Sequence, residues 1–180
     1  MIASFVMTSL DGFFDGNDPW DLSWHHTDEE FNAFAIEQLD EFDTLVFGRA
    51  TYEGMAQYWP SIDAVKDDPE VASRMNERPK LLVSRSLDVP APAWDNTRLV
   101  KDVRELPSDH RLLVLGSAVL TISLLEAGIL DELRVMVNPV LLGSGRPIAS
   151  TLRERIDLAL RGRREFGNGN VLLTYVPAPR

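Results

Sequence analysis

In the second half of the chain, an apolar run followed by small residues has the spacing of a phosphate-binding turn. Residues 112–115 (LLVL) lead into 116–118 (GSA), leucines at helical spacing continue as far as Gly128, and a further apolar run covers residues 133–137. This order predicts a strand–turn–helix–strand unit. Such a unit places the free N–H groups and the positive dipole end of a helix beside a strand end, where phosphate is commonly bound. The same residues also suit an ordinary turn, so the signal is weak by itself.

Residues suited to a nucleotide also follow three other segments that we predict to be strands. They are Thr8-Ser9-Leu10-Asp11-Gly12 after residues 2–7, Gly48-Arg49-Ala50-Thr51-Tyr52-Glu53 after residues 44–47, and Ser84-Arg85 at the end of residues 80–84. Each group alone is explained by a turn, a helix cap or a solvated charge. Because the carboxyl ends of parallel strands meet at one edge of a sheet, their coincidence there predicts a ligand site.

The elements that must position these residues indicate an α/β fold, with a mostly parallel central sheet, helices on both faces and a C-terminal antiparallel hairpin. We expect one domain over residues 1–180. The other expected elements are a strand at 97–100, a helix after a Thr27–Glu30 capping box, helices at 49–58 and 69–76, a helical turn at 103–106, and long loops at 9–24 and 87–96. The hairpin is predicted from alternating runs at 156–166 and 171–176, joined by the sequence GNGN.

Composition argues against several classes of site. The chain has no cysteine and only His25, His26 and His110, which leaves little material for a metal site or a Ser-His-Asp triad. No apolar run approaches the roughly 18 residues that span a membrane. The first residues have the pattern of a strand and not of a signal peptide, so we expect a cytoplasmic protein.

Charge is unevenly distributed along the chain, whose net charge is −10. Residues 1–48 contain eleven acidic residues and no Lys or Arg, whereas the remaining residues are close to neutral. Because nucleic acids are bound chiefly through Lys and Arg contacts with phosphate, no nucleic-acid partner is expected. The first positive charge is Arg49, directly after Gly48 at a predicted strand end.

Taken in order, these segments resemble the dihydrofolate-reductase-like family, and more closely its branch related to the C-terminal reductase domain of the bifunctional riboflavin-biosynthesis enzyme. The resemblance extends from residue 2 to residue 176 and is carried by MTSLDGFF, LVFGRATYEGM, LLVSRSL, LGSAVL and LLEAGILDELRVMVNPVLLGSGRP. Each motif is loose alone, but their order and spacing together are specific. Two features depart from the family: Ile148-Ala149 follow Pro147 where an aromatic residue is common, and no zinc-deaminase signature is present.

The resemblance implies a reductase that uses NADPH as its cofactor. Carried over by motif, Gly48, Arg49 and Thr51 would meet the adenosine 2′-phosphate and the pyrophosphate. A planar guanidinium suits this role because it can donate two parallel hydrogen bonds to phosphate. The remaining implied cofactor contacts are Ser84 and Arg85 at the adenine ribose, Gly116, Ser117, Ala118 and Val119 around the pyrophosphate, and Ser9, Leu10, Asp11 and Gly12 beside the nicotinamide.

Two carboxylates are candidates for the catalytic proton donor. In dihydrofolate reductases an acid at the start of the first helix anchors the substrate, and Asp28 stands at about this place. Alternatively, Asp28 only favours a helix N-terminus through the helix dipole. Asp11 is the second candidate, and its alternative role is to form a turn through its side chain.

The substrate side of the predicted site is acidic and rich in aromatic residues. Trp20, Trp24 and Tyr52 are candidate substrate-binding residues, because aromatic faces stack on planar rings and attract cations. The excess of acids in residues 1–48 favours a neutral or cationic ring over a phosphorylated sugar. In the alternative interpretation, the acids are spread over the surface and the tryptophans close the core.

Three functions are compatible with the sequence. The first is an NADPH-dependent reductase of a small heterocyclic substrate, and the second is the 5-amino-6-(5-phosphoribosylamino)uracil reductase of riboflavin biosynthesis. The third is a nucleotide-binding sensor that no longer catalyses reduction. The resemblance also suggests a homodimer, for which residues 135–142 and the C-terminal hairpin offer an apolar edge or face.

Overall fold

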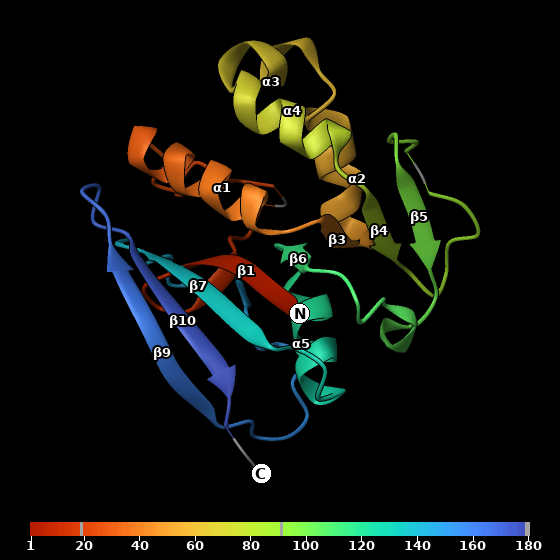
Figure 1. Cartoon of the computed structure of the whole chain (residues 1–180). Helices are drawn as coiled ribbons and strands as arrows, with labels where there is room; N and C mark the ends of the chain where they lie inside the picture. Colours follow the sequence, from red (N-terminus) through yellow and green to blue (C-terminus); the bar gives the residue numbers. More distant parts are fainter. Residues whose placement is uncertain (19, 91, 179–180) are drawn as a thin grey trace.

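A computed structural model describes residues 1–18, 20–90 and 92–178. Its strands are β1 (Ile2–Ser9), β2 (Phe13–Asp15), β3 (Thr44–Gly48), β4 (Lys80–Val83), β5 (Thr97–Val100), β6 (Leu112–Leu115), β7 (Glu132–Asn138), β8 (Arg146–Pro147), β9 (Leu158–Glu165) and β10 (Val171–Pro177). Its helices are α1 (Glu29–Glu41), α2 (Arg49–Tyr58), α3 (Ile62–Asp67), α4 (Pro69–Glu77), α5 (Ala118–Glu126) and the short 3₁₀ helix η1 (Val103–Glu105). Eight strands form one sheet in the order β5-β4-β3-β6-β1-β7-β10-β9, and β2 pairs with β8 (Figure 1).

Parallel pairing covers most of the sheet. The central strand β1 pairs in parallel with β6 and β7, and β3 pairs in parallel with β4 and β6. All eight residues of β1 are buried, which is typical of a parallel strand covered on both faces. At one edge, β10 runs antiparallel to both β7 and β9. The predicted parallel sheet with a C-terminal antiparallel hairpin is therefore confirmed.

Helices cover both faces of the sheet, as Figure 1 shows, with α1 to α4 on one side and α5 on the other. Beneath the first group lies a core cluster that contains Phe34, Phe47 and Met75. Beneath α5 lies a second cluster that contains Val114 and Leu124. Six of the nine residues of α5 are buried, so burial of apolar surface holds this helix firmly against the sheet.

The start of α1 differs from the predicted capping box. Asp28, and not Thr27, is the N-cap residue, and its Oδ1 accepts a 2.9 Å hydrogen bond from the Phe31 N–H. Oε2 of Glu30 accepts a 2.8 Å hydrogen bond from the N–H of Gly167, in the turn between β9 and β10. The capping-box prediction was wrong because a contact with a distant part of the chain uses the Glu30 carboxylate.

Three short elements were not predicted from the sequence. The β2–β8 pair and the six-residue helix α3 are too short to show a hydrophobic period. β2 lies inside the predicted 9–24 loop. Residue 19 of this loop and residue 91 of the predicted 87–96 loop lie outside the described residues. Among the described ranges, no helix has both the length and the apolar character required to cross a membrane.

Candidate functional site

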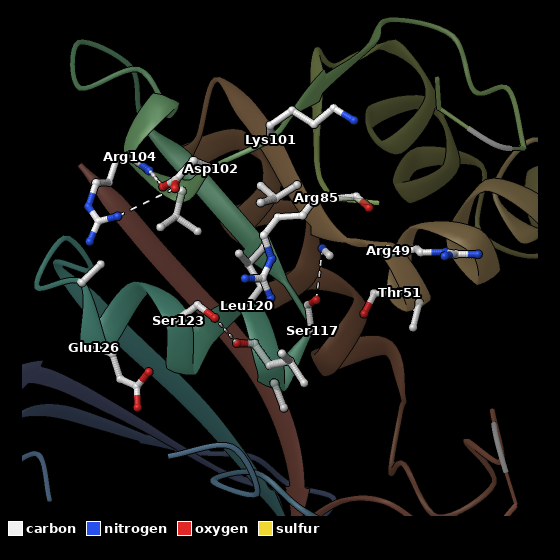
Figure 2. A pocket seen from close by; sticks show the side chains of 18 of the residues that line it. Arg49, Thr51, Arg85, Lys101, Asp102, Arg104, Ser117, Leu120, Ser123 and Glu126 are labelled. Carbon is white, nitrogen blue, oxygen red and sulfur yellow. Dashed lines mark hydrogen bonds and ion pairs between the residues drawn. The ribbon is translucent and has the colours of Figure 1, made fainter. Parts of the chain in front are cut away.

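A cavity of about 650 Å³ lies at the carboxyl ends of four neighbouring strands (Figure 2). Gly48 ends β3, Ser84 follows β4, Lys101 follows β5, and Ser117 follows β6, and all four residues line the cavity. This volume is in the range of small-molecule and cofactor pockets. The position agrees with the rule that open α/β sheets bind ligands beyond the carboxyl ends of their strands.

The first turns of α2 and α5 both line this cavity, and neither helix has a side-chain cap. By contrast, α1 is capped by Asp28 and α3 by Ser61. At α5, the hydroxyl of the N-cap residue Ser117 instead accepts a 3.0 Å hydrogen bond from the Gly48 N–H. Two helix N-termini without side-chain caps therefore line one cavity, and the free amides and positive dipole end of a helix N-terminus bind phosphate.

The turn before α5 depends on glycine at one position. Gly116 has φ +57°, and Ser117 follows with φ +60°, so both residues are left-handed. A Cβ atom on Gly116 would lie 3.2 Å from Cγ2 of Thr51, in the first turn of α2. The absent side chain lets the two helix starts approach each other.

The cavity is basic, although the whole chain is acidic. Six basic and two acidic side chains line it, an excess of four positive charges in a chain of net charge −10. The basic residues are Arg49, Arg85, Lys101, Arg104, Arg146 and Arg153, and the acidic ones are Asp102 and Glu126. Such a concentration of one sign of charge in a concave site attracts a polyanion.

The two predicted cofactor arginines are oriented differently. In Figure 2, the Arg85 side chain extends across the cavity towards Leu120 of α5, whereas Arg49 lies at the rim and points outward. Nε of Arg49 is 2.7 Å from Oε1 of Glu53, and its Nη1 is 3.5 Å from Oγ of Ser86. Arg49 therefore has a fixed direction at the entrance, while Arg85 lies over the centre.

The cavity unites most of the predicted cofactor residues and adds several that the sequence did not indicate. Those that line it are Gly48, Arg49, Thr51, Ser84, Arg85, Ser117, Ala118 and Val119. The predicted residues outside the described cavity wall are Ser9, Leu10, Asp11, Gly12 and Gly116. Lys101 and Asp102 follow β5, so applying the strand-end argument to residues 97–100 would have found them. Arg104, Ser123 and Glu126 carried no sequence signal, because only packing brings η1 and the outer face of α5 to the wall.

Asp11 connects two loops. Its Oδ1 accepts hydrogen bonds from the Ser9 hydroxyl (2.6 Å) and the Leu142 N–H (3.2 Å), and its Oδ2 accepts one from the Gly143 N–H (2.8 Å). These donors, the Ser9 hydroxyl foremost, lower the pKa of the Asp11 carboxyl. Asp11 is therefore a carboxylate at neutral pH, and it fastens the turn after β1 to the loop after β7.

The predicted aromatic residues have very different exposures. Trp20 is 48% exposed, whereas Trp24 is 7% exposed and packs edge-on against His25, with ring centroids 4.2 Å apart. Burial lowers the pKa of His25 to about 4, so this imidazole is neutral at physiological pH. Tyr52 is fully buried, and its hydroxyl donates a 3.0 Å hydrogen bond to the carbonyl oxygen of Pro92. Contrary to its predicted role, Tyr52 is a core residue here, because surrounding aromatic side chains cover its ring.

Asp28 lies outside the core as the exposed N-cap of α1, in the segment that leads from Trp24 into the helix. Its carboxylate is thus available to a ligand while it holds the first turn. Across residues 1–18, 20–90 and 92–178, no three His, Asp or Glu side chains gather in a way that could hold a metal ion.

The sheet order and the cavity at its strand ends define a dihydrofolate-reductase-like fold. More particularly, the chain belongs to the family described as RibD C-terminal domain, whose pattern matches residues 1–172. This confirms the branch that the motifs had indicated. A Bacillus subtilis (strain 168) protein, YyaP, described as uncharacterized, is 26% identical over 175 residues, which are 94% of this chain and 91% of that protein.

Two solved structures illustrate the fold. One is a candidate riboflavin biosynthesis protein from Shewanella sp. PV-4, with TM-score 0.72, 21% identity and 99% coverage of both chains. The other is a dihydrofolate reductase from Enterococcus faecalis in complex with NADP(H), with TM-score 0.58, 17% identity and coverage of 99% of this chain and 97% of that one.

Proposed function

We propose that this protein is an NADPH-dependent reductase of a small heterocyclic substrate. The observation that carries the proposal is the basic cavity into which the uncapped N-termini of α2 and α5 both open. An excess of four positive charges suits a dinucleotide with a pyrophosphate and a third phosphate group. Membership of the RibD C-terminal domain family and the NADP(H) complex of a structural neighbour support the same cofactor class.

The chain's own residues would hold the cofactor as the motifs imply. Of the predicted residues Gly116 to Val119, Gly116 already donates its N–H to the carbonyl oxygen of Phe5, so the amides of Ser117 to Val119 would cradle the pyrophosphate. Arg49 and Thr51 would meet the phosphates at the entrance, and Ser84 and Arg85 would lie against the adenine ribose. Ser9 to Gly12 would flank the nicotinamide, on the turn that Asp11 fastens. When bound, NADPH supplies the hydride, and the protein orients the ring and excludes water.

Asp28 is the better of the two proposed proton donors. The carboxylate of Asp11 is occupied by three hydrogen-bond donors and has a lowered pKa, which disfavours a protonated form. Asp28 accepts one hydrogen bond with Oδ1, which leaves lone pairs of its carboxylate for a substrate or a water molecule. We therefore assign proton transfer to Asp28 and loop positioning to Asp11.

Cofactor titration tests the proposal directly. By isothermal titration, NADPH should bind at least tenfold more tightly than NADH, and Arg49→Ala should remove most of that difference. The matched control is Arg161→Ala, because Arg161 is an exposed arginine on β9, away from the cavity. Equal affinities for the two cofactors in the wild-type protein would contradict the proposal.

Substrate identity is tested by a screen of NADPH oxidation against pterins, pyrimidine ribosylamines and quinones. The acidic segment 1–48 favours an uncharged or cationic ring. Tight NADPH binding without turnover of any compound would instead identify a nucleotide-binding sensor.

A second candidate function is the reduction of the phosphorylated ribosylamino-pyrimidine of riboflavin biosynthesis. The observation in its favour is Arg146, which lines the cavity and forms an ion pair with Asp15 of β2. Arg146 thereby places a positive charge beside the N-terminal acidic segment, which has no Lys or Arg of its own. A substrate with a ribose phosphate would require such a charge for binding. Efficient turnover of the phosphorylated compound alone, lost in Arg146→Ala, would favour this function over the first.

We further propose that the chain acts as a single domain in a cytoplasmic homodimer. Strand β9 forms one edge of the sheet and exposes Leu158 (37%) and Leu160 (54%). The apolar first half of this edge strand can pair with a second copy, although its second half is charged. Light scattering that shows a 20.2 kDa monomer at all micromolar concentrations would exclude the dimer.

A further inference from the structure

Trp20 is the exposed tryptophan of the segment between β1 and α1, and it has an unusual backbone. Its φ is +65°, a left-handed conformation that is rare for a bulky side chain. Such conformations cost free energy and persist where the surrounding structure enforces them, often at ligand sites. Nearly half of its surface (48%) is open to solvent, although a large aromatic ring gains from burial.

The indole of Trp20 lies flat on helix α2 at Gly54. A Cβ atom built on Gly54 would be 2.4 Å from Cη2, 2.4 Å from Cζ2 and 2.7 Å from Cζ3 of Trp20. If the Cβ atom lay in the plane of the indole, beyond its edge, at least one of these three consecutive ring carbons would be much farther from it than the nearest one. The three distances are nearly equal, so the Cβ atom would lie over the face of the ring. One face of the ring is therefore covered by the helix backbone, and the exposure of Trp20 leaves the other face free.

The contact between Trp20 and Gly54 lies on the same helix as part of the cavity wall. Thr51 lines the cavity in the first turn of α2, and Gly54 follows it by three residues, so both are on the same side of the helix. One helical turn rises about 5.4 Å. Measured along the axis of α2, a ring stacked on Trp20 would thus lie about one turn from a ligand held at the helix N-terminus.

The charges around Trp20 restrict what can stack on it. Asp18 and Asp21 flank it in the sequence, and both are exposed. The Ser23 hydroxyl, which donates to Oδ1 of Asp21, lowers the pKa of Asp21 and keeps this group charged. An indole face with adjacent carboxylates accepts planar uncharged or cationic rings and repels anions.

We propose that Gly54 is a specificity-determining residue: its missing side chain lets the Trp20 indole lie on α2 as a stacking platform for a planar heterocycle without negative charge. The inference rests on the proposed function, because it places the platform beside the cofactor as part of the substrate site. In a helix interior, alanine is otherwise favoured over glycine, so the glycine needs a local reason. The close approach of Trp20 supplies that reason.

The test uses lumazine, an uncharged two-ring heterocycle, as the probe, with ribose 5-phosphate as the anionic comparison. Equilibrium dialysis gives the affinity of both compounds for the wild-type protein, Trp20→Phe, Trp20→Ala, Gly54→Ala and the double variant. Acrylamide quenching of tryptophan emission gives a second readout, because Trp20 is the most exposed of the four tryptophans: Trp59 is half-buried, and Trp24 and Trp94 are buried. The emission of Trp20→Phe gives the contribution of the other three. NADPH affinity is measured for each protein separately.

Lumazine should bind the wild-type protein and protect its emission from acrylamide, whereas ribose 5-phosphate should not protect this emission even if its phosphate binds in the basic cavity. Affinity for lumazine should fall about tenfold in Trp20→Ala and in Gly54→Ala, as expected for one lost stacking contact, and should be largely kept in Trp20→Phe. In the Trp20→Ala background, Gly54→Ala should cause no further loss of lumazine affinity, because the indole that would clash with the new Cβ atom is absent.

The proposal is overturned if lumazine does not bind, if Trp20→Ala binds it normally, or if Gly54→Ala is equally harmful without Trp20. Failure of the proposed function has a different signature. In that case NADPH does not bind the wild-type protein, whatever lumazine does.

Discussion

The backbone N–H of Gly48 donates a 3.0 Å hydrogen bond to Oγ of Ser117, and this bond joins the end of β3 to the start of α5. The two residues are 69 positions apart in the chain. The bond satisfies a buried amide and fixes the spacing of the two helix N-termini that open into the cavity. A Cβ atom at position 48 would lie 2.1 Å from the same Oγ, so any side chain there would displace the Ser117 hydroxyl and break this bond.

The first prediction concerns this contact. Gly48→Ala should lower the free energy of unfolding by about 2 kcal/mol, as overpacking of a core site does, and should weaken NADPH binding. Ser117→Ala should cost about 1 to 3 kcal/mol, because it leaves the Gly48 N–H unpaired. The double variant should lose clearly less than the sum, because Ser117→Ala removes the atom that clashes. Urea unfolding measures all three, and strict additivity would show that the contact does not couple the residues.

The second prediction separates the two roles of Asp28. Asparagine caps a helix about as well as aspartate, so Asp28→Asn should keep the thermal stability, whereas Asp28→Ala should cost about 1 kcal/mol. If Asp28 transfers the proton, both variants should lower kcat about 100-fold, since general acids contribute at least this much. Full turnover in Asp28→Asn would show that Asp28 is only a helix cap.

The third prediction follows from the buried imidazole of His25. Burial lowers the pKa of His25 to about 4, so the unfolded chain, with a histidine pKa near 6.5, binds the proton more tightly. Stability is therefore lost as the pH falls from about 6.5 towards 4, by about 2 kcal/mol at pH 5. His25→Asn should lack this component. The measurement is the difference in unfolding free energy between the two proteins at pH 7.5 and pH 5, and a difference that does not change with pH would refute the assignment.

The fourth prediction concerns Lys80, the buried first residue of β4. Its Nζ donates hydrogen bonds to the carbonyl oxygens of Asn76 (2.8 Å), Arg78 (2.8 Å) and Asp95 (3.0 Å). Lys80→Met keeps the length of the side chain but leaves these carbonyls without the donor, so it should lower the unfolding free energy by about 2 kcal/mol. Lys66→Met, at an exposed lysine of α3, is the matched control and should change stability by less than about 0.5 kcal/mol.

Several elements could be predicted from the sequence because their signals are local. The helix at 49–58 and the strands at 97–100 and 112–115 have the predicted bounds, and the antiparallel hairpin forms around the predicted turn. Glycine at 48 and at 116 ends an apolar run in each case, and such breaks depend only on neighbouring residues. The strand ends then identified Arg49, Ser84 and Ser117 as parts of one site.

Other features depend on contacts between distant segments, which no local pattern encodes. The hydroxyl of Tyr52 bonds to Pro92 and its ring packs on Trp94, both about 40 residues away, as well as on the nearby Phe47, and these contacts make it a core residue. Arg104 and Glu126 reach the cavity only because η1 and α5 pack beside it. The carboxylates of Asp11 and Glu30 are both recruited by backbone amides more than 130 positions further along the chain.

The sequence by itself determined the order of the longer strands and helices, the family and the strand ends where the cavity lies, because periodicity, glycine positions and the family's motifs are properties of the linear chain. The tertiary structure alone decided which charges share the cavity, which aromatic rings stay exposed and which carboxylate is already occupied. The physical reason is that burial and hydrogen bonding are set by the packing of residues far apart in the sequence.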